Sequence, residues 1–115
     1  MISVDMIGLS TASLAGYSLD RVLASGTRLG FSSVEILGFE GERHSQGDLC
    51  GFAFAERGPG DVDSLRASLS AYGRISVHAP FIFVPLLTAN PGIQREALRQ
   101  VESCIQGIGS VGGTS

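Results

Sequence analysis

Two ionisable side chains, Glu35 and His78, stand where this 115-residue sequence could carry chemistry. His78 closes the apolar run Ile75-Ser76-Val77, and Pro80 follows two residues later. Because proline donates no ladder hydrogen bond and pushes the residue before it towards an extended backbone, the pattern predicts a strand that stops just after His78. Parallel sheets build their sites at the carboxyl ends of their strands, so this histidine is expected beside a ligand.

Glu35 stands alone in a second apolar run. Side chains alternate along a strand, so Val34 and Ile36 share one face and Glu35 lies on the other. A carboxylate inside a sheet is costly unless it is paired, and His78 on a neighbouring strand is the predicted partner. The pair could orient the imidazole or bind a substrate hydroxyl. The alternative for each residue is a purely structural hydrogen bond within the sheet.

Strand and helix patterns alternate three times along the chain. Strands are predicted over residues 4–9, 34–37 and 75–78. The first helix is expected to follow an N-cap at Ser18, the second to be capped by Asp61 and ended by Gly73, and the third to open at Asn90 and Pro91. This alternation predicts an α/β fold with a parallel sheet and right-handed crossovers.

The third helix is predicted to bury a stripe of residues at helical spacing, formed by Ile93, Ala97, Val101, Ile105 and Ile108. Beyond it, Val111 could begin a fourth strand, although Gly112 and Gly113 weaken that pattern.

Three segments in order carry a resemblance to a known family: Gly30-Phe31-Ser32-Ser33-Val34-Glu35-Ile36, His78-Ala79-Pro80-Phe81, and Arg95-Glu96-Ala97-Leu98. Together they resemble the xylose isomerase-like TIM-barrel superfamily, which includes sugar-phosphate isomerases and epimerases and endonuclease IV. The resemblance implies three consecutive βα units of a parallel (β/α)8 barrel, with residues 1–115 forming a single partial domain. A complete barrel takes roughly 250 residues, so the chain is expected to be the N-terminal portion of one.

The resemblance also implies a function. The parent reaction would be isomerisation or epimerisation of a sugar or sugar phosphate, by proton or hydride transfer next to a carbonyl. A divalent metal (Mn, Mg, Co or Zn) would polarise the substrate oxygens. Glu35 and His78 are expected to bind substrate, and His78 is also the candidate metal ligand because the matching histidine of endonuclease IV-like relatives binds metal. The catalytic bases are expected on further strands, so the chain alone is predicted to be inactive.

Two alternatives stay open. The first is an apurinic-site endonuclease of the endonuclease IV type. A net charge of −3 and the absence of lysine oppose it, because phosphate backbones are bound through cationic side chains. The second is a non-catalytic half-barrel that self-associates, which would cover two open sheet edges and the apolar segment 81–87 and would make the chain a homo-oligomer.

Composition and patterning exclude several other classes. With no lysine, the chain has neither a Schiff-base lysine nor a Walker-type phosphate loop. Two isolated cysteines and no leader-like N-terminus predict a reduced, cytoplasmic protein, and the longest apolar run is too short to cross a membrane. A polar cluster in the long segment 38–60 matches no metal signature and is expected to be a solvated loop; its members are Glu40, Glu42, His44 and Asp48.

Overall fold

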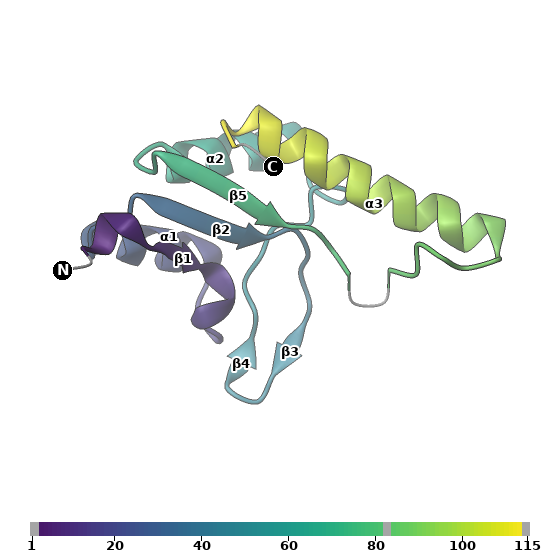
Figure 1. The fold of residues 1–115 in the computed structure, drawn as a ribbon, viewed down its shortest axis with the longest axis horizontal. Coiled ribbons are helices and arrows are strands. Elements are labelled where there is room, and N and C mark those ends of the chain that lie inside the picture. The colour runs from purple at the N-terminus through teal and green to yellow at the C-terminus, as the bar shows by residue number, and fades with distance from the viewer. Residues whose placement is uncertain (1–2, 82–83, 114–115) are drawn as a thin grey trace.

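The computed structural model describes residues 3–81 and 84–113 (Figure 1). It is an α/β fold with a three-stranded parallel sheet. The strands of this sheet are β1 (Gly8–Ser10), β2 (Ser33–Leu37) and β5 (Arg74–His78), and the helices are α1 (Leu19–Arg28), α2 (Pro59–Leu69) and α3 (Pro91–Ser110). Short 3-10 helices lie at Val4–Met6 and Thr11–Ser13, and a hairpin of β3 (Arg43–His44) and β4 (Gly47–Asp48) projects from the segment between β2 and α2.

The central strand of the sheet is β2, with β1 and β5 parallel on its two sides. The strands predicted over 34–37 and 75–78 are confirmed to within one residue. The first strand is shorter than predicted because residues 4–6 turn into a 3-10 helix, in which the Met6 N–H donates to the Ser3 carbonyl at 3.0 Å. Pairing therefore begins only at Gly8, opposite Ser33.

The hydrophobic core lies on one face of the sheet. Val34, Ile36 and Ile75 form that face and are at most 6% exposed. Residues from all three helices belong to the same buried cluster: Leu23 of α1, Leu65 and Leu69 of α2, and Cys104 and Ile108 of α3. The helices thus cover one face, as right-handed crossovers between successive neighbouring strands require. By strand alternation, Glu35 and His78 lie on the other face.

Two helix starts are confirmed. The Ser18 hydroxyl accepts from the Arg21 N–H, and the Asn90 side chain accepts from Gly92 and Ile93. The predicted start of α2 is three residues too late. Gly58 is the N-cap and Pro59 opens the helix, while Asp61 in the first turn accepts from the Gly58 N–H at 3.3 Å. A proline suits the first helical position because an N–H at that position has no intrahelical acceptor, so its absence loses no hydrogen bond.

The prediction that Gly73 ends α2 in a left-handed conformation is also wrong. Gly73 has no positive φ, and α2 already ends at Leu69. The Gly73 N–H instead donates to the Ser32 carbonyl at 2.8 Å. The glycine therefore starts the pairing of β5 beside β2 and does not terminate the helix.

The predicted buried stripe of α3 is only partly correct. Ala97 and Ile108 are buried, but Ile93 and Ile105 are 48% and 51% exposed. Cys104, outside the predicted stripe, is fully buried. The reason is that α3 meets the core along one narrow line, and its first turns extend past the end of β5 (Figure 1).

Val111 does not begin a strand. It caps the C-terminus of α3 and is 3% exposed in the core. The next residue, Gly112, has φ +86°, and the Gly113 N–H donates to the Ile108 carbonyl at 2.8 Å. This left-handed ending turns the chain back on the helix.

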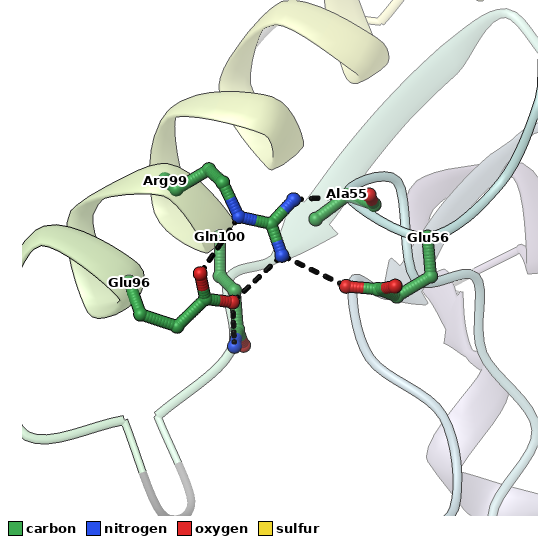
Figure 2. A network of polar contacts seen from close by, with 5 residues as sticks. All are labelled: Ala55, Glu56, Glu96, Arg99 and Gln100. Carbon is green, nitrogen blue, oxygen red and sulfur yellow. Dashed lines mark hydrogen bonds and ion pairs between the residues drawn. The ribbon is translucent and has the colours of Figure 1, made fainter. Parts of the chain in front are cut away.

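Helix α3 is tied to the loop before α2 by a polar network (Figure 2). Arg99 donates to the Ala55 carbonyl at 3.1 Å and pairs with Glu56 at 2.9 Å. It also donates to both oxygens of Glu96, and this contact, with a further bond from Gln100, holds the pKa of Glu96 at about 2. The network is exposed, so we assign it an orienting role for α3 and a small share of the stability.

Thr11 joins the ends of β1 and β2 to the segment at residue 50. Its side chain is fully buried; the hydroxyl donates to the Cys50 carbonyl at 3.3 Å and accepts from the Leu37 N–H at 3.2 Å. The Cys50 thiol in turn donates to the Thr11 carbonyl at 3.4 Å. At the carboxyl end of β2, the Thr11 side chain therefore makes hydrogen bonds that backbone groups of a paired strand make elsewhere in the sheet.

Replacing Thr11 with valine should lower the free energy of unfolding by about 1–3 kcal/mol, because two buried backbone groups lose their partner while the shape is retained. Urea unfolding measures this loss. Thr11→Ser keeps the hydroxyl and serves as the matched control. Equal stability of the valine variant and the wild type would show that the two hydrogen bonds contribute nothing.

Both cysteine thiols should resist alkylation in the folded protein at neutral pH. Burial raises the pKa of Cys50 and raises that of Cys104 to about 11, so neither presents the reactive thiolate. Mass spectrometry after iodoacetamide treatment should find both unmodified, and unfolding in urea should expose both. Rapid native modification of Cys104 would contradict its placement in the core.

Candidate functional site

The sheet brings Glu35 and His78 together. Glu35 pairs with Ser76 across the β2–β5 ladder, and Leu37 pairs with His78, so the acid and the imidazole are offset by two residues on one face. The distance from His78 Nδ1 to Glu35 Oε1 is 3.7 Å. This is long for a direct hydrogen bond and short enough for an ion pair once the imidazole is protonated. The predicted partnership of these two residues is confirmed.

Neither side chain is buried as deeply as the sequence suggested. The side chain of Glu35 is 44% exposed and that of His78 is 47% exposed. Both can therefore reach a ligand from solvent. Their exposure weakens the alternative in which they serve only as structural hydrogen-bonding groups inside the sheet.

A row of small polar side chains runs across the same face. The ladder aligns Ser10, Glu35 and Ser76 on three adjacent strands, which places two hydroxyl groups beside the carboxylate. A cavity of about 520 Å³ lies over this part of the sheet and is lined by all three residues, with Ser33 and Arg74 further along. The row offers donors and acceptors at the spacing of adjacent strands, about 5 Å.

Two phenylalanines form an apolar wall next to His78. The Phe81 ring stacks on the imidazole with centroids 5.0 Å apart and an interplanar angle of 19°. Phe39 meets both rings edge-on, at 6.3 Å from His78 and 5.9 Å from Phe81. Phe81 is 59% exposed, so part of its ring is available to a ligand. We call these residues the Glu35 site: Ser10, Glu35, Phe39, Ser76, His78 and Phe81.

Sequence reasoning missed Phe39. Its position depends on the turn after β2, where the Gly38 N–H donates to the His78 carbonyl at 2.9 Å and so carries the next residue towards β5. A side chain at position 38 would also collide with the thiol of Cys104. The available signal was an aromatic residue soon after the ends of two strands, Phe39 after β2 and Phe81 after β5.

The polar cluster of the long segment makes contacts of its own. His44 is exposed on the hairpin, Asp48 pairs with Arg43 at 3.3 Å, and Glu40 pairs with Arg57, which lowers the pKa of Glu40. A second cavity, of about 510 Å³, lies between the hairpin and the starts of α1 and α2. Its acidic side chains are already engaged in local contacts: Asp20 with Ser68, Asp61 with Gly58, Glu40 with Arg57, and Asp48 with Arg43.

Glu35 and His78 could supply two donors to a metal, one carboxylate oxygen and one imidazole nitrogen. Protein sites for Zn²⁺ use at least three protein ligands. Within residues 3–81 and 84–113 no group of three or more histidine, cysteine, aspartate or glutamate side chains is arranged to hold a metal ion. The role of His78 as a metal ligand stays a prediction.

Most of the described part of the apolar segment 81–87 is exposed, and Val84 is half-buried. Leu86 and Leu87 are 40% and 99% exposed, while Ile82 and Phe83 lie outside the described residues. A membrane-crossing role finds no support in the helices of the described chain, since none combines the necessary length with the necessary apolar character.

Comparison of the chain with protein-family models, with curated proteins and with solved structures gave no significant match.

Proposed function

We propose that this chain supplies part of the wall and part of the substrate site of a TIM-barrel isomerase or epimerase that acts on a sugar or sugar phosphate. The observation that carries the proposal is the Glu35–His78 pair, 3.7 Å apart at the carboxyl end of a parallel sheet and on the face without core helices. Glu35 and His78 bind the substrate hydroxyls next to the reacting carbon.

The difference between the two faces of the sheet supports the proposal that it forms part of a barrel wall. In a doubly wound sheet both faces are covered and apolar, whereas a barrel has helices outside and strand side chains inside. Here the three helices share the face of Val34, Ile36 and Ile75. The other face presents serine and glutamate, which suits the mouth of a barrel.

The chemistry of the pair suits a polyhydroxylated substrate. A carboxylate accepts hydrogen bonds from adjacent hydroxyls, and a neutral imidazole donates with one nitrogen and accepts with the other. Glu35 and His78 are also residue types that move protons near neutral pH when a neighbour tunes them. A divalent metal would supply polarisation of the substrate oxygens, and Glu35 and His78 would offer it two donors, one fewer than a zinc site takes from protein.

Removing either polar group should weaken sugar binding by roughly ten- to hundredfold, the usual effect of losing a hydrogen bond to a charged or polar partner. The test is titration of the isotope-labelled full chain with D-glucose, D-fructose, D-xylose and their phosphates, followed by NMR at the amides of residues 35, 76 and 78. Glu35→Gln and His78→Asn are the variants.

The chain offers matched controls on the hairpin and the segment before it. Glu42→Gln and His44→Asn change the same residue types away from the site and should leave affinity unchanged. Binding that survives both site substitutions, or a panel in which no sugar perturbs these amides at millimolar concentration, would reject the proposed function. Turnover by this chain is not required by the proposal.

A further inference from the structure

We infer that the substrate of this chain is a dipolar sugar, which carries a cationic amino group bound by Glu35 and an anionic group, phosphate or carboxylate, bound by Arg74. This inference rests on the proposed function and narrows its substrate class. It is drawn from two opposite charges that line one cavity on the face of the sheet without core helices. We call this face the open face.

The cavity, of about 520 Å³, lies over two neighbouring rows of the sheet ladder. Gly8, Ser33 and Arg74 form one row, and Ser10, Glu35 and Ser76 form the next. Four of these six residues are glycine or serine, whereas bulky branched side chains usually fill the interior of a barrel. Among the described residues that line the cavity, Glu35 and Arg74 alone are charged. The rows therefore leave space for a ligand between one acid and one base.

The two charges are separated along the ladder. Glu35 is paired with Ser76, two residues beyond Arg74 on the neighbouring strand. Two residues of strand rise about 6.6 Å and adjacent strands lie about 4.8 Å apart, so the two Cα atoms are about 8 Å apart. In the described part of the chain their side chains form no ion pair with each other, because the Glu35 carboxylate approaches His78, at 3.7 Å, towards the other end of β5. A ligand can contact both charges at once.

Both charged groups have hydrogen-bonding capacity to spare. Arg74 is exposed, and its guanidinium makes no hydrogen bond or ion pair with the rest of residues 3–81 and 84–113. A guanidinium offers five N–H donors in a planar fork that matches the oxygens of a phosphate or a carboxylate. The Glu35 carboxylate has two oxygens that accept several hydrogen bonds, and the distance to His78 is long for one. It can therefore accept from an ammonium group as well.

A sugar ring suits the space between the two charges. In a pyranose, an amino group on C2 and an anionic group on C6 extend from opposite sides of the ring, so the ring bridges Glu35 and Arg74. An α-amino acid would be too short, since its two charged groups share one carbon. The hydroxyls of Ser10, Ser33 and Ser76 lie along the cavity and can bond to the ring hydroxyls. The amino group takes the place of one hydroxyl that the proposed function assigns to Glu35.

The test is NMR titration of the labelled full chain, at neutral pH and constant ionic strength, with D-glucose, D-glucosamine, D-glucose 6-phosphate and D-glucosamine 6-phosphate. The doubly charged sugar should bind about tenfold or more tightly than either singly charged one, because each group adds a hydrogen bond to a charged partner. A parallel comparison of 2-amino-2-deoxy-D-glucuronic acid with D-glucuronic acid shows whether a carboxylate serves in place of the phosphate.

Two variants assign the charges. Glu35→Gln should remove most of the gain from the amino group and keep the gain from the phosphate, and Arg74→Gln should do the reverse. Glu42→Gln and Arg95→Gln are the matched controls, because neither residue lines the cavity, and both gains should survive in them. The amide spectrum of each variant shows that it is folded.

Binding of D-glucosamine 6-phosphate no tighter than that of D-glucose 6-phosphate, or no tighter than that of D-glucosamine, would overturn the inference and leave the proposed function standing. This comparison uses the wild type, so it decides the question even where a variant fails to fold. A gain from the phosphate that persists in folded Arg74→Gln would also overturn it. If no sugar of this panel or the earlier one binds, the proposed function is rejected and the inference with it.

Discussion

Replacing Gly51 with alanine is expected to lower the free energy of unfolding by about 3 kcal/mol or more. A Cβ at this position would collide with the Phe39 carbonyl and lie 2.8 Å from the Leu37 carbonyl. Both are backbone atoms at the end of the central strand, so neither can rotate away as a side-chain tip would. Relief requires the chain after β2 to move.

The same change should disturb the Glu35 site. Gly51 forms a parallel bridge with Leu37, and the Phe52 N–H donates to the Leu37 carbonyl at 2.8 Å. Displacing this contact shifts the turn that carries Phe39 towards His78. We therefore expect the amide resonances of residues 37–39 and 78 to move in any fraction that still folds.

Urea unfolding of Gly51→Ala against Gly109→Ala tests this expectation. Gly109 lies in α3 with open space where its Cβ would be, so alanine there should stabilise the helix by up to about 1 kcal/mol. A Gly51→Ala protein as stable as the wild type would mean that segment 50–52 does not pack against β2 as described.

Local sequence signals predicted the parts of the fold that depend on few residues. Period-two alternation and Pro80 located β5, and the hydroxyl of Ser18 and the amide of Asn90 located two helix starts. The pairing of Glu35 with His78 follows from the same alternation when β2 and β5 are neighbouring strands. These inferences succeed because capping and strand periodicity act over a few residues.

The features that were missed depend on contacts between distant segments. Ile105 has the spacing of a core residue, but the line along which α3 meets the sheet leaves it 51% exposed. Helical spacing predicts which residues share one face of a helix. It does not predict how much of that face the neighbouring elements cover. Phe39 joined the site because Gly38 binds the end of β5 forty residues later, a contact with no local signal. The barrel itself remains part of the proposal.

Replacing Ile36 with alanine is also expected to have a large effect, lowering the free energy of unfolding by about 2–5 kcal/mol. Ile36 is 0% exposed in the central strand, inside the cluster that joins the sheet to all three helices. Removing three carbons there leaves a cavity that the surrounding strands and helices cannot fill. Chemical denaturation measures the loss.

Two companion variants separate burial from side-chain chemistry. Ile36→Val removes one carbon and should cost about 0.5–1.5 kcal/mol, so the two values should rise with the volume removed. Ile105→Ala makes the same chemical change as Ile36→Ala at a half-exposed position and should cost well under half as much. Equal losses at positions 36 and 105 would contradict the half-exposed placement of Ile105 on α3.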